Sequence, residues 1–128
     1  MKIYIHMDEK IQLNSEVSRR YSKALFKIAK EKNTVQKIYK EVNDLLELLE
    51  NNIKFTKILQ SPLLSSKNQL TVITGLFSDK DNKKILVSKH ILFFLKVLAK
   101  NGRLNILLGV FYSFKYLVES LNEVVNVN

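Results

Sequence analysis

Apolar residues recur at three- and four-residue intervals along most of this 128-residue chain. Such intervals gather side chains on one side of an α-helix, whereas a strand would alternate at every second residue. Short polar stretches, Pro62 and Gly102 interrupt the pattern. The uninterrupted segments predict six helices, at about residues 15–32, 35–49, 53–59, 66–77, 88–101 and 104–121. The predicted fold class is therefore all-α, a compact six-helix bundle.

Two of these helices carry apolar residues on more than one side. In the fifth helix Ile91–Leu95 runs without a polar break, and the polar positions that remain form one narrow stripe of Lys89, Lys96 and Lys100. The first helix has one apolar face made of Val17, Tyr21, Ala24, Leu25 and Ile28, and Phe26 lies opposite that face. A helix that is apolar around much of its circumference packs on several sides. The first and fifth helices are therefore predicted to be central.

Several helix ends carry recognisable capping residues. Asn14 or Ser15 can accept hydrogen bonds from the free backbone N–H groups of the first helix. Ser66, with Gln69 three residues later, matches a capping box and predicts the start of the fourth helix. At the end of the fifth helix Asn101-Gly102 supplies the residues best suited to a left-handed conformation, which predicts a sharp corner.

The same pattern suggests how the chain is organised. Residues 1–14 are expected to form a flexible N-terminal tail, because their short alternation of apolar and polar residues has no partner strand nearby. Residues 15–121 are expected to form the six-helix domain. After that point Val125 and Val127 alternate with Asn as they would in a strand. Residues 122–128 are therefore expected to be the start of a linker or of a C-terminal region that is missing here.

The residue types that catalysis and metal binding need are scarce. The chain has no Cys, which excludes a disulfide framework, a thiolate zinc site and a Cys nucleophile. His6 and His90 stand in no spacing that presents two nitrogens to a metal. We predict no enzyme activity, no cofactor and no metal. The longest purely apolar run, Ile91–Leu95, is far shorter than the roughly 20 residues that span a bilayer, so no direct membrane insertion is expected.

The chain is strongly basic, with 21 Lys and Arg, 12 Asp and Glu and a net charge of +9. Such an excess favours encounters with nucleic acid, an anionic membrane or an acidic protein. On the first helix Arg20, Lys23, Lys27 and Lys30 share a face and form a basic ridge that could follow a phosphate backbone. A basic all-helical RNA-binding domain is thus one interpretation. A solvated lysine face is the other, because no aromatic residues interleave there to stack on bases.

Binding of a partner helix would explain why the first and fifth helices carry apolar residues on more than one side. If they lie side by side, the small residues Ala24, Ala29 and Ala99 leave room for a groove. An amphipathic helix from another chain can lie in such a groove. An ordinary, well-filled core is the alternative.

Four stretches, in this order, resemble one family. Arg20–Phe26 reads RYSKALF, Leu59–Ser65 reads LQSPLLS, Phe94–Ala99 reads FLKVLA and Asn101–Leu104 reads NGRL. These stretches are similar to the opening helix, the SP turn, the fifth helix and the corner of the delta subunit of bacterial F-type ATP synthase, the counterpart of the mitochondrial oligomycin-sensitivity-conferring protein. The resemblance covers about residues 15 to 128. The departures are Ser22 for Ala, Ile53 for Pro and Gln69 for Lys.

The resemblance implies a non-catalytic stator module. Its six-helix N-terminal domain would cap the F1 head and bind the N-terminal helix of an alpha subunit between its first and fifth helices. The groove positions carried over are Tyr21, Ala24 and Val97, with Leu25, Ile28 and Leu98 as neighbours. In the full-length subunit the C-terminal region, which would begin where residues 122–128 end, would hold the peripheral-stalk b subunit. The module would sit peripherally at the cytoplasmic face of the bacterial inner membrane. No nucleic-acid partner is expected.

Overall fold

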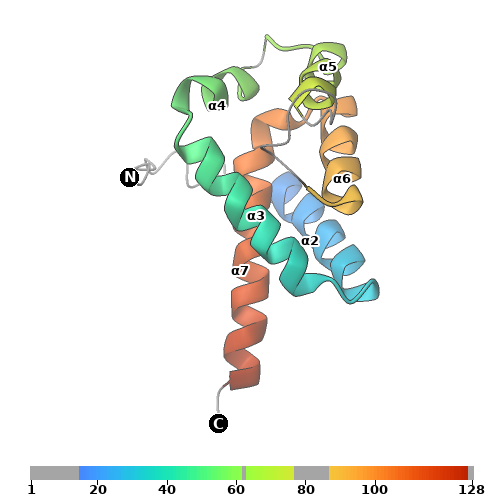
Figure 1. The fold of residues 1–128 in the computed structure, drawn as a ribbon, viewed down its shortest axis with the longest axis vertical. Helices are drawn as coiled ribbons and strands as arrows, with labels where there is room; N and C mark the ends of the chain where they lie inside the picture. Colours follow the sequence, from blue (N-terminus) through green and yellow to red (C-terminus); the bar gives the residue numbers. More distant parts are fainter. Residues whose placement is uncertain (1–14, 62, 77–86, 127–128) are drawn as a thin grey trace. The chain divides into compact units, whose positions relative to one another are not determined.

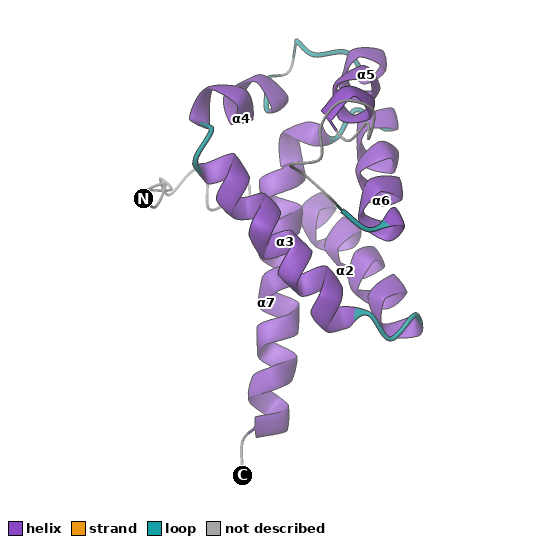
Figure 2. Cartoon of the chain, in the orientation of Figure 1, coloured by secondary structure: helices purple, strands orange, loops and turns teal. Residues whose placement is uncertain are grey.

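The computed structural model describes residues 15–61, 63–76 and 87–126 of the chain. Within these ranges it consists of six α-helices, one 3-10 turn and no strand (Figure 2), which confirms the predicted all-α class. The predicted N-terminal tail, residues 1–14, lies outside the described residues. The elements are α2 (Glu16–Glu31), α3 (Val35–Glu50), α4 (Ile53–Leu59), α5 (Ser66–Leu76), α6 (Lys89–Lys100), η1 (Leu104–Ile106) and α7 (Leu107–Asn126).

The chain divides into two compact units. The first contains α2, α3 and α7, coloured blue, teal and red in Figure 1. The second covers Asn52–Asn105 and contains α4, α5 and α6, coloured green, yellow-green and orange. The prediction that the first and fifth helices are central combines α2 of the first unit with α6 of the second. That arrangement therefore stays a prediction.

In the first unit α7 packs against both α2 and α3. Its buried side chains are large, and the fully buried ones include Val110, Phe111, Phe114 and Val118. The stretch Leu104–Leu121 is long and apolar enough to cross a membrane by length and composition. Because the large side chains of α7 are buried against two neighbouring helices, we interpret α7 as the core helix of this unit.

The side of α2 that is most buried is not the one with the most apolar sequence. Its buried residues are Ser18, Ser22, Leu25 and Ala29. Tyr21 and Ile28 are only half-buried and Ala24 is exposed. The two serines are buried at low cost because their hydroxyls bond locally: Ser22 Oγ donates to the Arg19 carbonyl at 2.9 Å, and Ser18 Oγ accepts from Ser15 Oγ at 3.0 Å. Small side chains let a neighbouring helix approach closely.

Two tyrosine–glutamate hydrogen bonds join α3 to α7. Tyr39 Oη donates to Glu119 Oε2 at 2.7 Å, and Tyr112 Oη donates to Glu50 Oε2. Each helix supplies one tyrosine and one glutamate. The bond near the start of α3 reaches the later of the two α7 residues and the bond at its end reaches the earlier one, so the two helices run antiparallel. The bonds therefore specify the register of α3 against α7 in addition to its apolar packing.

The ends of α2 and α6 are built in the same way. Gly102 has a φ of 69°, as expected of a residue that ends a helix in the left-handed conformation. Its N–H donates to the Ala99 carbonyl at 2.9 Å, and the N–H of Arg103 donates to the Leu98 carbonyl at 2.8 Å. Asn33, with a φ of 55°, has the corresponding place after α2. The corner predicted at Asn101-Gly102 is confirmed.

Of the two helix caps predicted from the sequence, one holds and one fails. Ser15 Oγ accepts from the Ser18 N–H at 3.1 Å, so Ser15 caps α2. The start of α5 is capped by Ser65, whose Oγ accepts from the Asn68 N–H at 3.2 Å. The capping box predicted from Ser66 and Gln69 was therefore wrong, because Ser66 is already helical and the Gln69 side chain is engaged elsewhere.

Gln69 is the polar centre of the second unit. It is buried; its Nε2 donates to the Leu64 carbonyl at 2.8 Å, and its Oε1 accepts from the Leu104 N–H at 3.0 Å. These bonds tie the start of α5 to the turn before it and to the corner after α6. A Cβ built on Gly102 would lie 3.7 Å from the Ser66 Cβ, so the same corner also approaches α5 closely.

The structure corrects two further expectations. The strand-like alternation predicted from residue 122 onward was wrong for 122–126, because α7 runs to Asn126. Extending an existing helix costs little, and an isolated strand has no partner for its backbone. On α6, packing on several sides was expected for all of Ile91–Leu95, yet Phe93 is 66% exposed while Phe94 and Leu95 are buried.

Candidate functional site

The predicted groove residues on α2 fall into two layers. Tyr21, Ala24 and Ile28 recur at helical spacing and are exposed or half-buried, so their side chains reach the surface. Leu25 is only 1% exposed and belongs to the core of the first unit. Of the groove residues predicted on α2, Tyr21, Ala24 and Ile28 are therefore accessible, and Leu25 is not.

The groove residues on α6 show the same division. Val97 is half-buried, and Leu98 is fully buried at 0% exposure. These two residues lie in the second unit and the α2 residues lie in the first. The groove that combines both helices remains a prediction. The structure shows how exposed each of these residues is on its own helix.

The basic ridge on α2 is a solvent-exposed surface. Arg20, Lys23, Lys27 and Lys30 are all exposed. Lys30 Nζ lies 5.6 Å from the centre of the Phe26 ring, and that ring meets Phe114 edge to face at 6.2 Å. Because the Phe26 ring packs against α7 and under Lys30, it is not available to stack on a base. The ridge offers charge without an aromatic platform.

The titratable groups with displaced pKa values serve the structure of the first unit. Burial, and then the hydrogen bond to Glu50, raise the pKa of Tyr112. The hydrogen bond to Glu119, and then burial, raise the pKa of Tyr39. Both tyrosines are hydrogen-bond donors between α3 and α7, so their shifts follow from packing and mark no acid–base site.

Side chains that could together hold a metal ion do not gather in the part of the chain that the structure describes. Within residues 15–61, 63–76 and 87–126 no three His, Cys, Asp or Glu side chains group as they would around a metal. His90 lies half-buried in the first turn of α6. Every buried side-chain N or O in those ranges has a hydrogen-bond partner.

Sequence reasoning missed the exposure of Phe93. Phe93 lies four residues after Lys89 and three before Lys96, so it belongs to the lysine stripe and not to the buried side of α6. The spacing of Phe93 from these two lysines could have predicted its exposure. The run of five consecutive apolar residues instead suggested that the helix is buried on every side.

In the ranges that the structure describes the fold is all-helical, and the hydrogen-bonded side chains described above serve caps, a corner and the register of α3 against α7. The family model described as "ATP synthase delta (OSCP) subunit" matches residues 17–128. The chain belongs to this ATP synthase delta (OSCP) subunit family, which confirms the resemblance in the four sequence stretches.

Curated relatives agree with this assignment. The chain is 34% identical over 122 residues to ATP synthase subunit delta of Rickettsia bellii, covering 91% of this chain and 62% of the relative. It is 32% identical over 111 residues to the protein of the same name from Chlorobium chlorochromatii, covering 87% of this chain and 59% of the relative. The chain therefore spans about three-fifths of the length of these relatives. Their names describe a subunit, in agreement with the prediction that this chain is not itself an enzyme.

Proposed function

We propose that this chain is a stator subunit of an F-type ATP synthase, in which this domain caps the F1 head without performing chemistry. The family match, continuous over residues 17–128, carries this proposal. The domain would hold the head still while the rotor turns and so support proton-driven ATP synthesis. As part of the synthase it would sit peripherally at the cytoplasmic face of the bacterial inner membrane.

The partner of this domain is proposed to be the N-terminal helix of an alpha subunit. Tyr21, Ala24 and Ile28 on α2, with Val97 on α6, are the residues assigned to contact that helix. Leu25 and Leu98 are assigned to support them from beneath, because both are buried. The peripheral-stalk b subunit would attach through a C-terminal region of the full-length protein. The exposure of Ala24 beside half-buried Tyr21 and Ile28 supports this assignment.

The energetics allow such a contact but require more than apolar burial. Four apolar anchors contribute roughly 6 to 12 kcal/mol of gross transfer free energy. Association costs about 4 to 15 kcal/mol. The exposed ridge of Arg20, Lys23, Lys27 and Lys30 can speed the encounter with an acidic partner, since complementary charge raises association rates.

A fluorescence anisotropy titration tests the proposal, with a labelled peptide of the same organism's alpha-subunit N-terminus. We expect saturable binding that Ala24→Asp and Val97→Asp each weaken by at least about tenfold, because each buries an unpaired charge at the interface. Gln36→Asp is the matched control, since it adds the same charge at an exposed position of α3. If the peptide does not bind, or if all three variants bind it equally well, the proposal is wrong.

RNA binding through the ridge on α2 is the second candidate, motivated by four exposed cations on one helix face. Retention of a single-stranded RNA at low salt, with an affinity that falls steeply as salt is added, would favour it. We expect no retention, because the neighbouring Phe26 is covered by Lys30 and by α7.

A further inference from the structure

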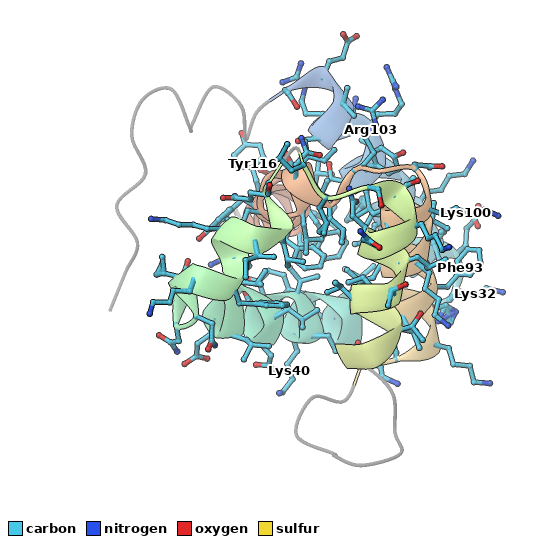
Figure 3. All side chains as sticks on the ribbon, turned by 90° about the horizontal axis from the view of Figure 1, so that it is seen from above. Lys32, Lys40, Phe93, Lys100, Arg103 and Tyr116 are labelled. Carbon is cyan, nitrogen blue, oxygen red and sulfur yellow. The ribbon has the colours of Figure 1, made fainter. Side chains whose placement is uncertain are left out.

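The corner after α6 contains an asparagine directly followed by a glycine, Asn101-Gly102, and no other asparagine of the chain precedes a glycine. Asn101 is the C-cap of α6 and is exposed. Lys100 and Arg103, on either side of the pair, are exposed as well (Figure 3). An asparagine side chain in this position can react with the backbone that follows it, because glycine has no side chain to block the approach. The pair is therefore a candidate for spontaneous covalent modification.

The reaction joins the backbone nitrogen of Gly102 to the side chain of Asn101. The nitrogen loses its proton to hydroxide and attacks the Asn101 Cγ; the C–N bond of the side-chain amide breaks, and ammonia leaves with a proton taken from water. The product is a five-membered cyclic imide. Water then opens this ring at one of its two carbonyls and leaves aspartate or isoaspartate at position 101. One water is consumed and one ammonia is released, without oxidation or reduction.

The folded corner opposes both requirements of this reaction. The N–H of Gly102 donates to the Ala99 carbonyl at 2.9 Å, so its proton is protected from hydroxide. Asn101 has a ψ of 3°, which eclipses its own backbone N, and not its Cβ, with the nitrogen of Gly102. Ring closure needs the Cβ in that place, about a third of a turn away on a tetrahedral Cα. The reaction therefore requires a rotation that breaks the hydrogen bond to Ala99.

We propose that Asn101-Gly102 is a modification site gated by local opening of this corner. The side-chain amide of Asn101 is preserved while the corner is closed and is converted to aspartate or isoaspartate when the corner opens. Gln69 keeps the corner closed, because its buried Oε1 accepts from the Leu104 N–H at 3.0 Å. Local openings of this kind need less free energy than global unfolding.

The modification would itself prevent the corner from closing again. Isoaspartate places the Cβ of position 101 in the main chain, and the longer backbone no longer brings the N–H of Gly102 to the Ala99 carbonyl. Either product also puts a carboxylate at the C-terminal end of α6, where the helix dipole disfavours negative charge. Conversion at position 101 would therefore be a lasting mark of chains whose corner has opened.

Incubation of the full chain in mildly alkaline buffer, with and without urea, tests the protection by the fold. Chymotryptic peptide mapping with mass spectrometry measures conversion at position 101. We expect conversion to be at least about tenfold faster in urea, because the rate follows the population of the open form. Asn33 is the internal control: the branched side chain of Thr34 hinders the attack, so Asn33 should convert far more slowly in urea.

The variant Asn101→Gln confirms the assignment of the reacting residue. Its side chain would have to close a six-membered ring, so we expect no conversion at this position over the same time in urea. Equal conversion of Asn101 with and without urea, or no conversion in urea, would overturn the proposal.

Three further variants test whether the opening is local. Gln69→Leu removes the acceptor of the Leu104 N–H and should speed conversion in buffer at least about fivefold. Asn68→Leu changes the neighbouring exposed residue and should leave the rate unchanged. Ile38→Val removes a buried carbon from the first unit and destabilises the chain without touching the corner, so it should also leave the rate unchanged.

Circular dichroism verifies that each variant is folded during the incubation. If Gln69→Leu converts no faster than the unmodified chain, the Gln69 bond does not hold the corner closed. If Ile38→Val accelerates conversion as much as Gln69→Leu does, the reaction follows global unfolding. Either result would overturn local gating at this corner.

Discussion

At the scale of single residues, Gln69 shows how one side chain organises a unit. Its position three residues after Ser66 suggested a local capping role, which a short-range pattern can detect. Its actual partners are the Leu64 carbonyl and the N–H of Leu104, the second of which is 35 residues away. A contact across that distance depends on how helices pack, so local spacing contains no information about it. Gln69 therefore joins the turn before α5 to the corner after α6.

Replacing Gln69 by Leu should lower the free energy of unfolding by about 1 to 3 kcal/mol, because the buried N–H of Leu104 loses its acceptor. Urea denaturation followed by circular dichroism measures this loss. Asn68→Leu changes the neighbouring exposed residue and should have an effect smaller than about 0.5 kcal/mol. Equal stability of the two variants would show that the Gln69 bonds contribute nothing.

Replacing each of two glycines by alanine should change the free energy of unfolding in opposite directions. Gly102→Ala is expected to destabilise by about 1 to 2 kcal/mol, since its φ of 69° is costly for a residue with a Cβ. Gly75 lies exposed inside α5, and a Cβ there would meet nothing within 4 Å. Gly75→Ala should stabilise by about 0.5 to 1 kcal/mol. Thermal unfolding of both variants checks the pair. A Gly102→Ala variant as stable as the unmodified chain would contradict the corner geometry, and a destabilised Gly75→Ala variant would contradict the open space at Gly75.

At the scale of elements, the sequence predicted all six helices because apolar periodicity is a local property. It placed both ends of α4 correctly, since Asn52 precedes the first apolar residue and Ser61-Pro62 follows the last. It placed the end of α7 too early, because alternation over a few residues competes poorly with extension of an existing helix. On α2 it favoured the face richest in apolar residues, whereas close packing selected a face with Ser18 and Ser22.

The two tyrosine bonds between α3 and α7 make the first unit sensitive to high pH. The raised pKa of Tyr112 means that folding favours the neutral phenol. This contribution to stability is complete below the ordinary tyrosine pKa of about 10 and is lost as the pH rises above it. We expect the melting temperature to fall between about pH 10 and 12, and to fall less steeply in Tyr112→Phe, which cannot ionise.

Tyr116→Phe is the control for this pH dependence, because Tyr116 is 70% exposed and donates no hydrogen bond to α3 in the described structure. It should follow the unmodified chain across the whole pH range. Melting curves of Tyr112→Phe that remain parallel to those of the unmodified chain above pH 10 would contradict a role for the Tyr112–Glu50 bond.

At the scale of the whole molecule, the chain belongs to the delta (OSCP) family and divides into two compact units. The sequence identified the family from four short stretches, and the match over residues 17–128 confirmed it. The partner groove stays a proposal. The residues assigned to it come from α2 and α6, and the structure shows only that some of them, such as Ala24, are exposed and others, such as Leu98, are buried. A binding measurement is therefore needed to identify the partner.

Binding to the assembled F1 head of the same organism tests the central claim most directly. The chain and purified F1 are mixed and separated by size-exclusion chromatography, and the F1 fractions are analysed for the chain. The proposed function predicts that the unmodified chain and Gln36→Asp elute with F1, while Ala24→Asp and Val97→Asp elute alone. If the unmodified chain elutes alone, or if the groove variants elute with F1 as it does, the proposed capping of F1 through these residues is contradicted.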